Sequence, residues 1–264
     1  MTQGSELTIV ILAYNEAANI RNAAVAIYGI ARAEELDFNL VLVNDGSSDD
    51  TGAICAMIAR DLADVPVTVI NNETNMGIGA SFRRALAQAQ SEYITWFPGD
   101  NDVSPDLVRD MLRAMRHADV TFTYFLNREI RGRTRNLISM LYCMAFMTVF
   151  ETFILYFNGP AVYRTRHVKD IPLHGTRFGF IAELHVKLLR SEISYLELPG
   201  YMLTGLEQSS AISWRNLREA ISTFIGLFVD VYWRHRGRFG HKPSRVHLTR
   251  DFKVLDYPGA APPH

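Results

Sequence analysis

Three aspartates in two short polar segments have the side chains and the spacing to hold a divalent cation. Asp45 follows one apolar run of the chain, while Asp100 and Asp102 follow a later run and are separated only by Asn101. On an extended loop, alternate residues project to the same side, so Asp100 and Asp102 could share one ion. Mg²⁺ and Mn²⁺ prefer hard oxygen ligands and bridge carboxylates to pyrophosphate oxygens. The pattern therefore suits the binding of a nucleoside diphosphate.

Both segments also have an ordinary structural interpretation. Aspartate and asparagine are common in solvated turns, and the Asp45-Gly46-Ser47 segment could be a turn that caps a following helix. Taken alone, the Asp-Asn-Asp triplet favours a turn. The position of both segments at the ends of expected strands favours a binding site.

The first half of the chain alternates short apolar runs with helical patterns, which is typical of repeated β-α-β units. Strands are expected at 7–12, 40–43, 67–70, 93–97 and 120–125, and helices at 17–35, 48–62, 77–89 and from 104 onwards. This order predicts a parallel sheet with helices on both faces. Ligands of open parallel sheets bind beyond the carboxyl ends of the strands, which here are followed by the loops 14–16, 44–46, 75–79 and 99–102.

The second half of the chain is basic at its start and apolar beyond it. Four arginines between positions 128 and 135 precede an apolar stretch, 137–157, which Glu151 interrupts. The uncharged part falls short of the roughly 20 residues needed to cross a bilayer, although it could lie on a membrane. Further elements are expected at 180–190, 193–198 and 214–236, followed by an irregular tail at 237–264.

The composition indicates a folded protein and narrows its partners. The 264 residues are 48% hydrophobic and 21% charged, which suits a large α/β domain with a sizeable core. A net charge of −1 argues against nucleic acid as a general partner. Cys55 and Cys143 lack the spacing of a zinc or redox pair and are expected to be buried thiols in a reducing compartment. The first six residues lack the pattern of a signal peptide, so a cytoplasmic location is expected.

Four segments of the first half resemble, in order, the signatures of glycosyltransferase family 2. They read LTIVILAYNE at 7–16, LVLVNDGSSDDT at 40–51, NMGIGASFRRALAQA at 75–89 and YITWFPGDNDVSPD at 93–106. The resemblance covers about the first 125 residues, which makes it more specific than any single motif. It implies a GT-A fold, in which a Rossmann-like, mostly parallel α/β sheet carries helices on both faces, and an enzyme that inverts the anomeric centre.

The resemblance also assigns roles to particular residues. It implies a nucleotide pocket lined by Ala13, Tyr14 and Glu16, a contact between Asp45 and the base, a donor-proximal segment from Gly77 to Arg83, and a catalytic Mg²⁺ or Mn²⁺ near Asp100 and Asp102. Two departures stand out: the first strand ends on Leu12 where the family usually has proline, and Pro98-Gly99 precedes the acidic triplet. In one alignment Pro98 takes the place of the first aspartate. Whether Asp100 and Asp102 both ligate the ion directly is left open.

The second half resembles, more loosely, the dolichyl-phosphate mannose synthase branch of this family. The similar segments are RTRNLIS at 133–139, GPAVYR at 159–164, GFIAEL at 179–184 and EQSSAISWR at 207–215. This implies that Arg135 and Ser139, with Arg133 close by, bind the phosphate of a polyprenyl-phosphate acceptor. An arginine fork matches phosphate oxygens, and an adjoining apolar helix could shelter isoprene units. A solvated basic loop before a buried core helix is the alternative.

Glu183 and three histidines complete the candidates. Glu183 could deprotonate a hydroxyl acceptor, orient a phosphate acceptor, or be an ordinary exposed helix residue. His174, His185 and His235 have no metal-ligand spacing and are expected at the surface or at helix caps. The helix at 221–233, followed by three arginines, could bind anionic lipid or pack on the domain.

These observations divide the chain into a nucleotide-sugar-binding half at 1–126, an acceptor-binding half with apolar, membrane-apposed helices at 127–236, and the tail. The expected activity is transfer of a hexose from a GDP- or UDP-linked donor to a polyprenyl-phosphate lipid at the inner face of the cytoplasmic membrane. A hydroxyl acceptor, or an inactive sugar-nucleotide-binding protein, are the alternatives. A Rossmann dehydrogenase is disfavoured because no G-x-G-x-x-G follows the first strand.

Overall fold

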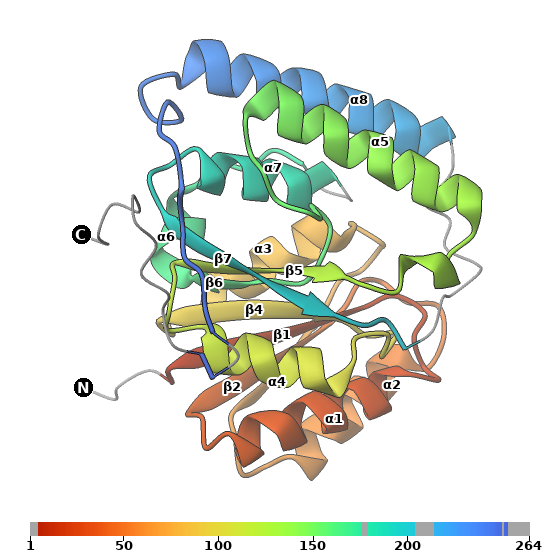
Figure 1. The fold of residues 1–264 in the computed structure, drawn as a ribbon. Helices are drawn as coiled ribbons and strands as arrows, with labels where there is room; N and C mark the ends of the chain where they lie inside the picture. The colour runs from red at the N-terminus through yellow and green to blue at the C-terminus, as the bar shows by residue number, and fades with distance from the viewer. Residues whose placement is uncertain (1–4, 176–178, 204–213, 250, 253–264) are drawn as a thin grey trace.

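A computed structural model describes residues 5–175, 179–203, 214–249 and 251–252. In this part of the chain, eight strands form one sheet in the order β3-β2-β1-β4-β6-β5-β7-β8 (Figure 1). The strands are β1 Leu7–Ala13, β2 Phe38–Asn44, β3 Val67–Asn71, β4 Tyr93–Pro98, β5 Val120–Phe125, β6 Val162–Arg164, β7 Ser194–Gly200 and β8 Ser244–Arg245. The α/β fold expected from the sequence is confirmed.

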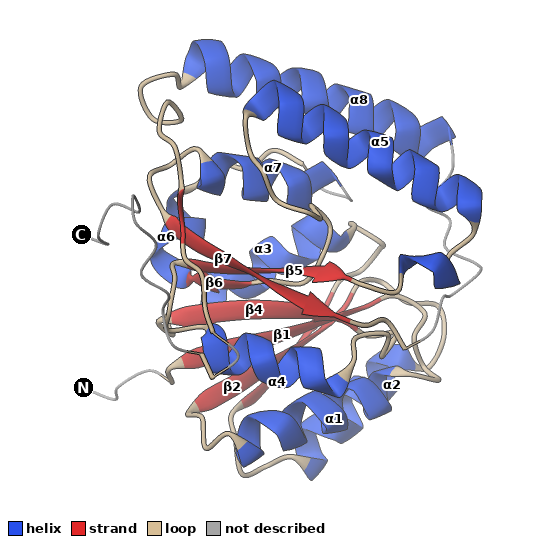
Figure 2. Cartoon of the chain, viewed as in Figure 1, coloured by secondary structure: helices blue, strands red, loops and turns tan. Residues whose placement is uncertain are grey.

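Helices cover both faces of this sheet (Figure 2). The helices are α1 Ile20–Ala33, α2 Thr51–Asp61, α3 Ile78–Gln88, α4 Pro105–Ala114, α5 Arg133–Phe150, α6 Thr165–Asp170, α7 Gly179–Leu189 and α8 Trp214–Val229, with a 3₁₀ turn at Arg128–Ile130 and a π-helical turn at Asp230–Arg234. Helices α1, α2 and α4 pack on one face, and α3, α6 and α7 pack on the other. Helices α5 and α8 form an outer layer beyond α7.

The central strands end together at one edge of the sheet. All seven residues of β1 are buried, as expected for a strand with helices on both faces. Strand β1 runs parallel to β2, with Ala13 opposite Asn44, and parallel to β4, with Leu12 opposite Pro98. The loops after these strands therefore start side by side.

The sheet is mixed, because β6 is antiparallel to both of its neighbours, β4 and β5. Two antiparallel steps restore the direction, so β5 and β7 run the same way as β4. The carboxyl ends of the strands from both halves of the chain thus share one edge. A single sheet crosses the expected boundary at residue 126, and the division into donor and acceptor halves stays a functional prediction.

The tail is more regular than expected. Ser244 and Arg245 pair with the start of β7, and Phe239 is fully buried. The described part of the tail up to these residues is therefore anchored to the sheet and core.

Helices α5 and α8 are joined by aromatic packing. The ring of Phe224 lies 5.1 Å from that of Phe146 and 5.2 Å from that of Phe150, and the Tyr232 hydroxyl donates to the Val149 carbonyl oxygen. None of the helices in the described residues is long and apolar enough to cross a membrane.

Candidate active site

The acidic triplet follows β4, beside the end of the neighbouring strand β1. The Gly99 N–H donates to the Leu12 carbonyl oxygen at 2.9 Å. A side chain at position 99 would place its Cβ 3.0 Å from the Cβ of Ala13 and 3.1 Å from Ile20. Close packing of the two strand ends therefore explains the glycine before the triplet.

The triplet is a turn and not an extended segment. Asn101 has a left-handed φ of 59°, and the Asp102 N–H donates to Asp100 Oδ1 at 3.1 Å. Asparagine tolerates this conformation better than most residues. The expectation that Asp100 and Asp102 project to the same side of an extended loop is wrong, because this turn folds the triplet back on itself.

The carboxylates at this edge nevertheless act on one another. Burial raises the pKa of Asp100 to about 6, and the negative charges of Asp102 and Glu16 add to that rise. Asp100 thus carries its charge at neutral pH against local repulsion. Three carboxylates from two loops make a site that a cation would stabilise.

The loop after β1 is fixed to the loop after β2. Asn15, with φ of 56°, accepts from the Ser48 N–H through its side chain at 2.8 Å, and its own N–H donates to Ser47 Oγ at 3.0 Å. The Glu16 N–H donates to Thr51 Oγ1 at 2.9 Å. These bonds hold the Glu16 backbone rigidly beside the triplet.

The other two residues assigned to the nucleotide pocket differ in exposure. Ala13 is buried, and its carbonyl oxygen accepts from the Asp45 N–H at 2.8 Å. The Tyr14 side chain is 47% exposed, so its ring is available to a ligand. Their assignment to the pocket stays a prediction.

Asp45 holds the loop that leads into α3. Its Oδ1 accepts from Asn72 Nδ2 at 2.7 Å and from the Met76 N–H at 2.9 Å, and its Oδ2 accepts from the Gly77 N–H at 2.8 Å. Gly77, with φ of 88°, is the N-cap of α3. Asn72 is a site residue that the sequence reasoning missed, and its place directly after β3 was the available signal. A contact of Asp45 with a base stays a prediction.

Gly46 permits the close approach of the same two loops. Its φ is 69°, and a Cβ there would lie 2.3 Å from the Thr74 carbonyl carbon. Only glycine fits this position without moving the backbone.

Arg83, which the resemblance assigns to the donor segment, connects α3 to the second half of the chain. Its guanidinium donates to the Gly175 carbonyl oxygen and lies 5.5 Å from the centre of the Phe180 ring. A donor contact by Arg83 stays a prediction.

The basic segment faces the acidic triplet from the end of β5. Burial lowers the pKa of Arg135, the charge of Arg131 lowers it further, and Tyr156 and Asp102 act in the opposite direction. The Arg135 guanidinium therefore lies within electrostatic reach of the Asp102 carboxylate. The fold brings one predicted metal ligand and one predicted phosphate ligand together.

Tyr156 organises the other arginines of this segment, a role that the sequence reasoning missed. The Arg131 Nη1 donates to the Tyr156 hydroxyl at 3.2 Å, and the Arg128 guanidinium lies 4.8 Å from the centre of the same ring. Arg133 is exposed at the first turn of α5. Ser139 lies one turn beyond Arg135, near the Cys143 thiol, whose pKa is raised by burial, an effect that Ser139 partly offsets.

A main-chain contact joins the triplet to the end of β7. The Leu203 N–H donates to the Asp102 carbonyl oxygen at 2.9 Å, and the Ser104 N–H donates to the Tyr201 carbonyl oxygen at 3.2 Å. Loops from both halves of the chain thus meet at the acidic triplet.

Comparison with known sequences decides the family. Residues 8–184 match the family model described as Glycosyl transferase family 2. The chain belongs to this family. The family assignment made from the four ordered motifs is confirmed.

Curated relatives match this chain over shorter stretches. The cholesterol galactosyltransferase of Borreliella burgdorferi is 24% identical over 37% of this chain and 28% of its own length. The Bacillus subtilis protein EpsH is 29% identical over 40% of this chain and 29% of its own length. The matched region spans about a third or less of the curated relatives.

Solved structures share the fold at low sequence identity. Mannosyl-3-phosphoglycerate synthase from Rubrobacter xylanophilus has a TM-score of 0.66 at 16% identity, over 96% of this chain and 84% of that one. Glucosyl-3-phosphoglycerate synthase from Mycobacterium tuberculosis, solved with Mn²⁺ and UDP-glucose, has a TM-score of 0.61 at 15% identity, over 85% and 80%. A Pyrobaculum calidifontis mannosyltransferase, solved with GDP-mannose and Mn²⁺, has a TM-score of 0.62 at 15% identity, over 85% and 65%. These likenesses confirm the GT-A fold, whereas membership of the dolichyl-phosphate mannose synthase branch stays a prediction.

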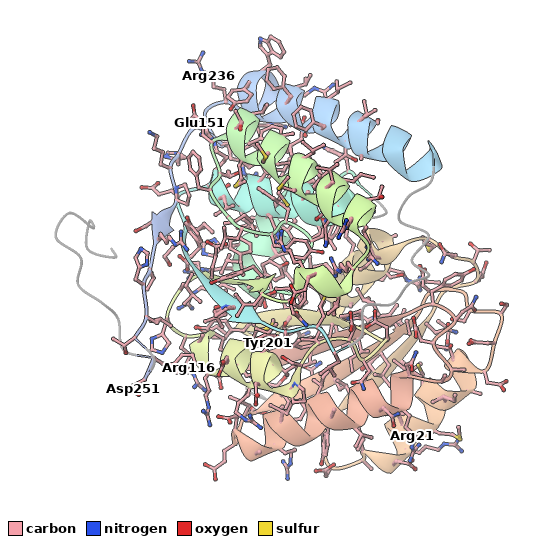
Figure 3. The ribbon with its side chains drawn as sticks, turned by 45° about the vertical axis from the view of Figure 1, so that its right-hand side comes forward. Arg21, Arg116, Glu151, Tyr201, Arg236 and Asp251 are labelled. Carbon is pink, nitrogen blue, oxygen red and sulfur yellow. The ribbon has the colours of Figure 1, made fainter. Side chains whose placement is uncertain are left out.

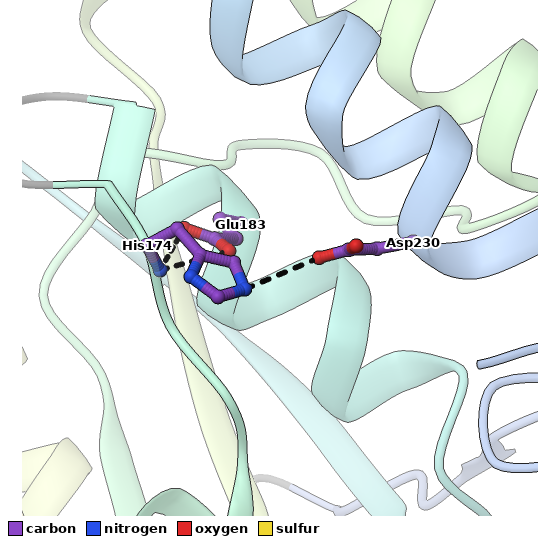
Figure 4. A group of neighbouring side chains, drawn as sticks. All are labelled: His174, Glu183 and Asp230. Atoms are coloured by element: carbon purple, nitrogen blue, oxygen red, sulfur yellow. Dashed lines mark hydrogen bonds and ion pairs between the residues drawn. The ribbon is translucent and has the colours of Figure 1, made fainter. Parts of the chain in front are cut away.

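Glu183 of this family 2 chain lies in a buried cluster on α7 (Figure 4). Its Oε2 accepts from the Gly175 N–H at 2.8 Å, and its Oε1 lies 2.7 Å from Lys187 Nζ. The alternative of an exposed helix glutamate is wrong, because α7 is buried along its whole length. A role as general base stays a prediction, although the carboxylate is already held by these donors.

The three side chains of Figure 4 are close enough together to hold a metal ion, but the ammonium group of a lysine lies between the two carboxylates. Ligand atoms of His174, Glu183 and Asp230 lie within 4.8 Å of one another. Lys187 Nζ, however, is 2.7 Å from Glu183 Oε1 and 2.9 Å from Asp230 Oδ2. The ammonium group already supplies the positive charge that a metal would bring.

The predicted histidine environments fare differently. His235 is exposed, as expected, and the His174 side chain is 67% exposed beside Asp230. His185 is not at the surface: it is buried, burial lowers its pKa to about 3, and its Nε2 lies 2.8 Å from the Tyr163 hydroxyl. Both cysteines are buried, as predicted.

Proposed function

We propose that this family 2 chain transfers a hexose, with inversion, from a GDP- or UDP-linked donor to a lipid phosphate, assisted by Mg²⁺ or Mn²⁺. One observation carries the proposal: the carboxylates of Glu16, Asp100 and Asp102 gather at the carboxyl edge of the sheet opposite Arg135. An acidic site suits a metal and a diphosphate, and an adjacent arginine suits a second phosphate.

The residues present fit a divalent cation. The pKa of Asp100 is raised by burial and by two neighbouring carboxylates, which is the condition that a bound cation relieves. Asp100 and Asp102 are its proposed ligands, and Glu16 contributes charge. A bound Mg²⁺ or Mn²⁺ would neutralise the negative charge that develops on the departing nucleoside diphosphate. Related folds crystallised with Mn²⁺ and a nucleotide-sugar support the choice of ion.

The rest of the donor site follows from the loops after β1 and β2. Tyr14 and Glu16 lie on a loop fixed by Ser47 and Thr51, and Asp45 fixes the loop before α3. Rigid loops of this kind orient a nucleotide without reorganisation on binding.

The acceptor phosphate is proposed to bind at the start of α5. Arg133 and Arg135 lie in its first turn, where the helix dipole also favours an anion. A phosphate oxygen attacks the anomeric carbon as the bond to the nucleoside diphosphate breaks. Because a phosphate is already ionised at neutral pH, this reaction needs no strong general base.

The lipid part of the acceptor is proposed to lie along the outer layer of α5 and α8. Large apolar side chains that are at least 45% exposed on this layer are Leu137, Ile138, Met140, Leu141, Met144, Ile221, Ile225 and Trp233. Helix α5 contains no acidic residue, and α8 contains one, Glu219. Exposed arginines flank the layer at Arg133 and at Arg236, which lies at the upper end of the view in Figure 3. An apolar surface bordered by arginines suits peripheral contact with an anionic membrane. The proposed location is the inner face of the cytoplasmic membrane.

The test incubates purified protein with radiolabelled UDP-glucose or GDP-mannose, Mn²⁺ and a polyprenyl phosphate in vesicles of anionic phospholipid. Label is expected in the organic phase, with loss of transfer in Asp100→Asn. Label confined to water-soluble products would overturn the lipid acceptor. No donor consumption with any acceptor, together with no donor binding, would favour an inactive sugar-nucleotide-binding protein.

A hydroxyl acceptor that carries a phosphate is the second candidate. Two solved structures of similar fold are phosphoglycerate-modifying synthases, so the same basic group could hold such a phosphate while a hydroxyl reacts. That reaction needs a base, for which Glu183 is the earlier candidate. Transfer to 3-phosphoglycerate, abolished in Glu183→Gln with donor binding intact, would favour it.

A further inference from the structure

A buried charge cluster couples the outer layer of helices to the donor helix α3. Lys187 is fully buried, and its ammonium group lies between Glu183 on α7 and Asp230 in the π-helical turn after α8. It also donates to the Pro172 carbonyl oxygen at 2.7 Å. The Lys187 ammonium group thus joins α7, the loop that precedes it and a turn that lies 43 positions further along the chain.

The charges in this cluster are matched. Burial alone would raise the pKa of Asp230, but the hydrogen bond and charge of Lys187, with His174 and Arg234, outweigh it and lower the pKa. Arg234 Nη1 lies 3.4 Å from Asp230 Oδ1, and its side chain is 67% exposed. Buried carboxylates need such partners, and removing one leaves an uncompensated charge.

The Glu183 carboxylate, which Lys187 holds in place, also holds the loop before α7. It accepts from the N–H groups of His174, at 3.1 Å, and of Gly175, at 2.8 Å. A Cβ at position 175 would lie 2.9 Å from the backbone of Phe180 and 3.1 Å from Glu183 Oε2, so the loop fits tightly against α7. The loop position therefore depends on the orientation of the Glu183 carboxylate.

The loop in turn holds α3. The Gly175 carbonyl oxygen accepts from the Arg83 guanidinium, which also lies over the Phe180 ring. Gly77 is the N-cap of α3, and its N–H donates to Asp45. The donor helix is thus held at its N-terminus by Asp45 and at Arg83 by the loop.

We infer that Lys187, Glu183 and Asp230 form a positioning brace that sets α3 and Arg83 for donor binding, and that Glu183 acts through this brace and not as a base. The inference rests on the proposed function only for the identity of the donor. The coupling between this cluster and α3 is a property of the folded chain without metal or donor. Lys187 and Asp230 thereby have a role in donor binding, although both lie far from the donor motifs in the sequence.

The test compares Lys187→Met with the milder Glu183→Gln, and uses Arg234→Ala as the matched control, because Arg234 touches the same aspartate from the exposed side. Hydrogen exchange is measured at 171–175 and at 78–88. Both segments are expected to exchange faster in Lys187→Met, less so in Glu183→Gln, and to be unchanged in Arg234→Ala. Faster exchange at 171–175 with α3 unchanged would overturn the inference.

A second measurement separates positioning from simple loss of fold. For correctly folded Lys187→Met and Glu183→Gln, the donor KM is expected to rise roughly 2- to 30-fold, with kcat at saturating donor little changed. The double variant Lys187→Met/Glu183→Gln removes the charges of both side chains, while the amide oxygen of the new glutamine can still accept from the Gly175 N–H. Compared with Lys187→Met alone, the double variant should therefore recover part of the protection from exchange at 171–175. A fall in kcat alone would instead make Glu183 the base. If the wild type binds no nucleotide-sugar, the proposed function fails, while the exchange data still decide the brace.

Discussion

Two clusters of buried or half-buried carboxylates in this chain shift the pKa of their members in opposite directions. At the donor edge, burial and the charges of Asp102 and Glu16 raise the pKa of Asp100 to about 6. On α7, Glu183 and Asp230 share Lys187, and the pKa of Asp230 is lowered despite its burial.

The difference indicates what each cluster is built to do. A group whose charges are already matched inside the protein gains nothing from an external ion and serves to hold segments together. A carboxylate such as Asp100, whose charged form is disfavoured by burial and by neighbouring carboxylates, is stabilised by an incoming cation, which is the behaviour of a binding site. Removing a charge should therefore destabilise the second cluster and leave the fold of the first intact.

The largest expected effect is on stability, in Lys187→Met. Because the side chain is fully buried between two carboxylates, the free energy of unfolding should fall by about 3–5 kcal/mol. Urea denaturation monitored by circular dichroism measures it. Arg234→Ala, which removes an exposed partner of the same Asp230, should cost no more than about 1 kcal/mol. Equal losses in the two variants would contradict the contrast between the clusters.

Asp100→Asn should show the reverse pattern, in which activity falls and stability does not. Loss of one charged ligand to the proposed metal should reduce transfer by about 100-fold or more, a magnitude typical of removing one electrostatic contact to a transition state. The melting temperature without metal should stay the same or rise, because repulsion with Glu16 and Asp102 is removed. Asp106→Asn is the matched control, since Asp106 lies on α4 with its side chain 89% exposed. A marked loss of stability in Asp100→Asn would show that this cluster is structural.

The pH dependence should separate the two states of the donor edge. Because the folded pKa of Asp100 is about 6, above its ordinary value, the cation-free fold binds this proton more tightly than the unfolded chain does, and Asp100 contributes stability as the pH falls through 6. Mn²⁺ competes with that proton, so its affinity should fall roughly tenfold for each pH unit below 6. The stabilisation by Mn²⁺, taken as the difference in melting temperature with and without the ion, should therefore grow as the pH rises from 5 to 7. Asp100→Asn should lose this dependence; an identical profile in the variant would assign it to another group.

Much of the donor edge could be predicted from the sequence, because its information is local. Strand ends, the Ser104-Pro105 helix start and the acidic triplet each occupy a few consecutive residues, and the Ser104 hydroxyl does cap α4. The triplet taken alone favoured a turn, and the left-handed φ of Asn101 agrees with that interpretation, whereas the extended conformation expected for a shared metal site was wrong. Strand β6 was missed, because its three residues are too short to show a period.

The second cluster was hidden because its information is not local. Asp230 lies 43 positions beyond Lys187, and nothing in either segment indicates that they meet. A partial signal was available: Glu183 and Lys187 are four residues apart, which is the spacing of a helical ion pair. That spacing usually lies on a solvated face, and only the burial of α7 on both sides turns it into a brace.

The smallest effect is expected for Arg135, which lies where the basic segment meets the acidic triplet. In Arg135→Ala, the KM for a polyprenyl-phosphate acceptor should rise about tenfold, because one charge-assisted contact to phosphate is worth roughly 1.5 kcal/mol. The donor KM should change little, although loss of a positive charge near Asp102 should slightly strengthen Mn²⁺ binding. Arg135→Lys keeps the charge but not the planar fork, so an intermediate KM is expected. Arg166→Ala, which removes a 70% exposed arginine on α6, is the control for a general loss of positive charge. If Arg135→Ala raises the donor KM and leaves the acceptor KM unchanged, then Arg135 belongs to the donor site, and the phosphate at the start of α5 is that of the nucleotide.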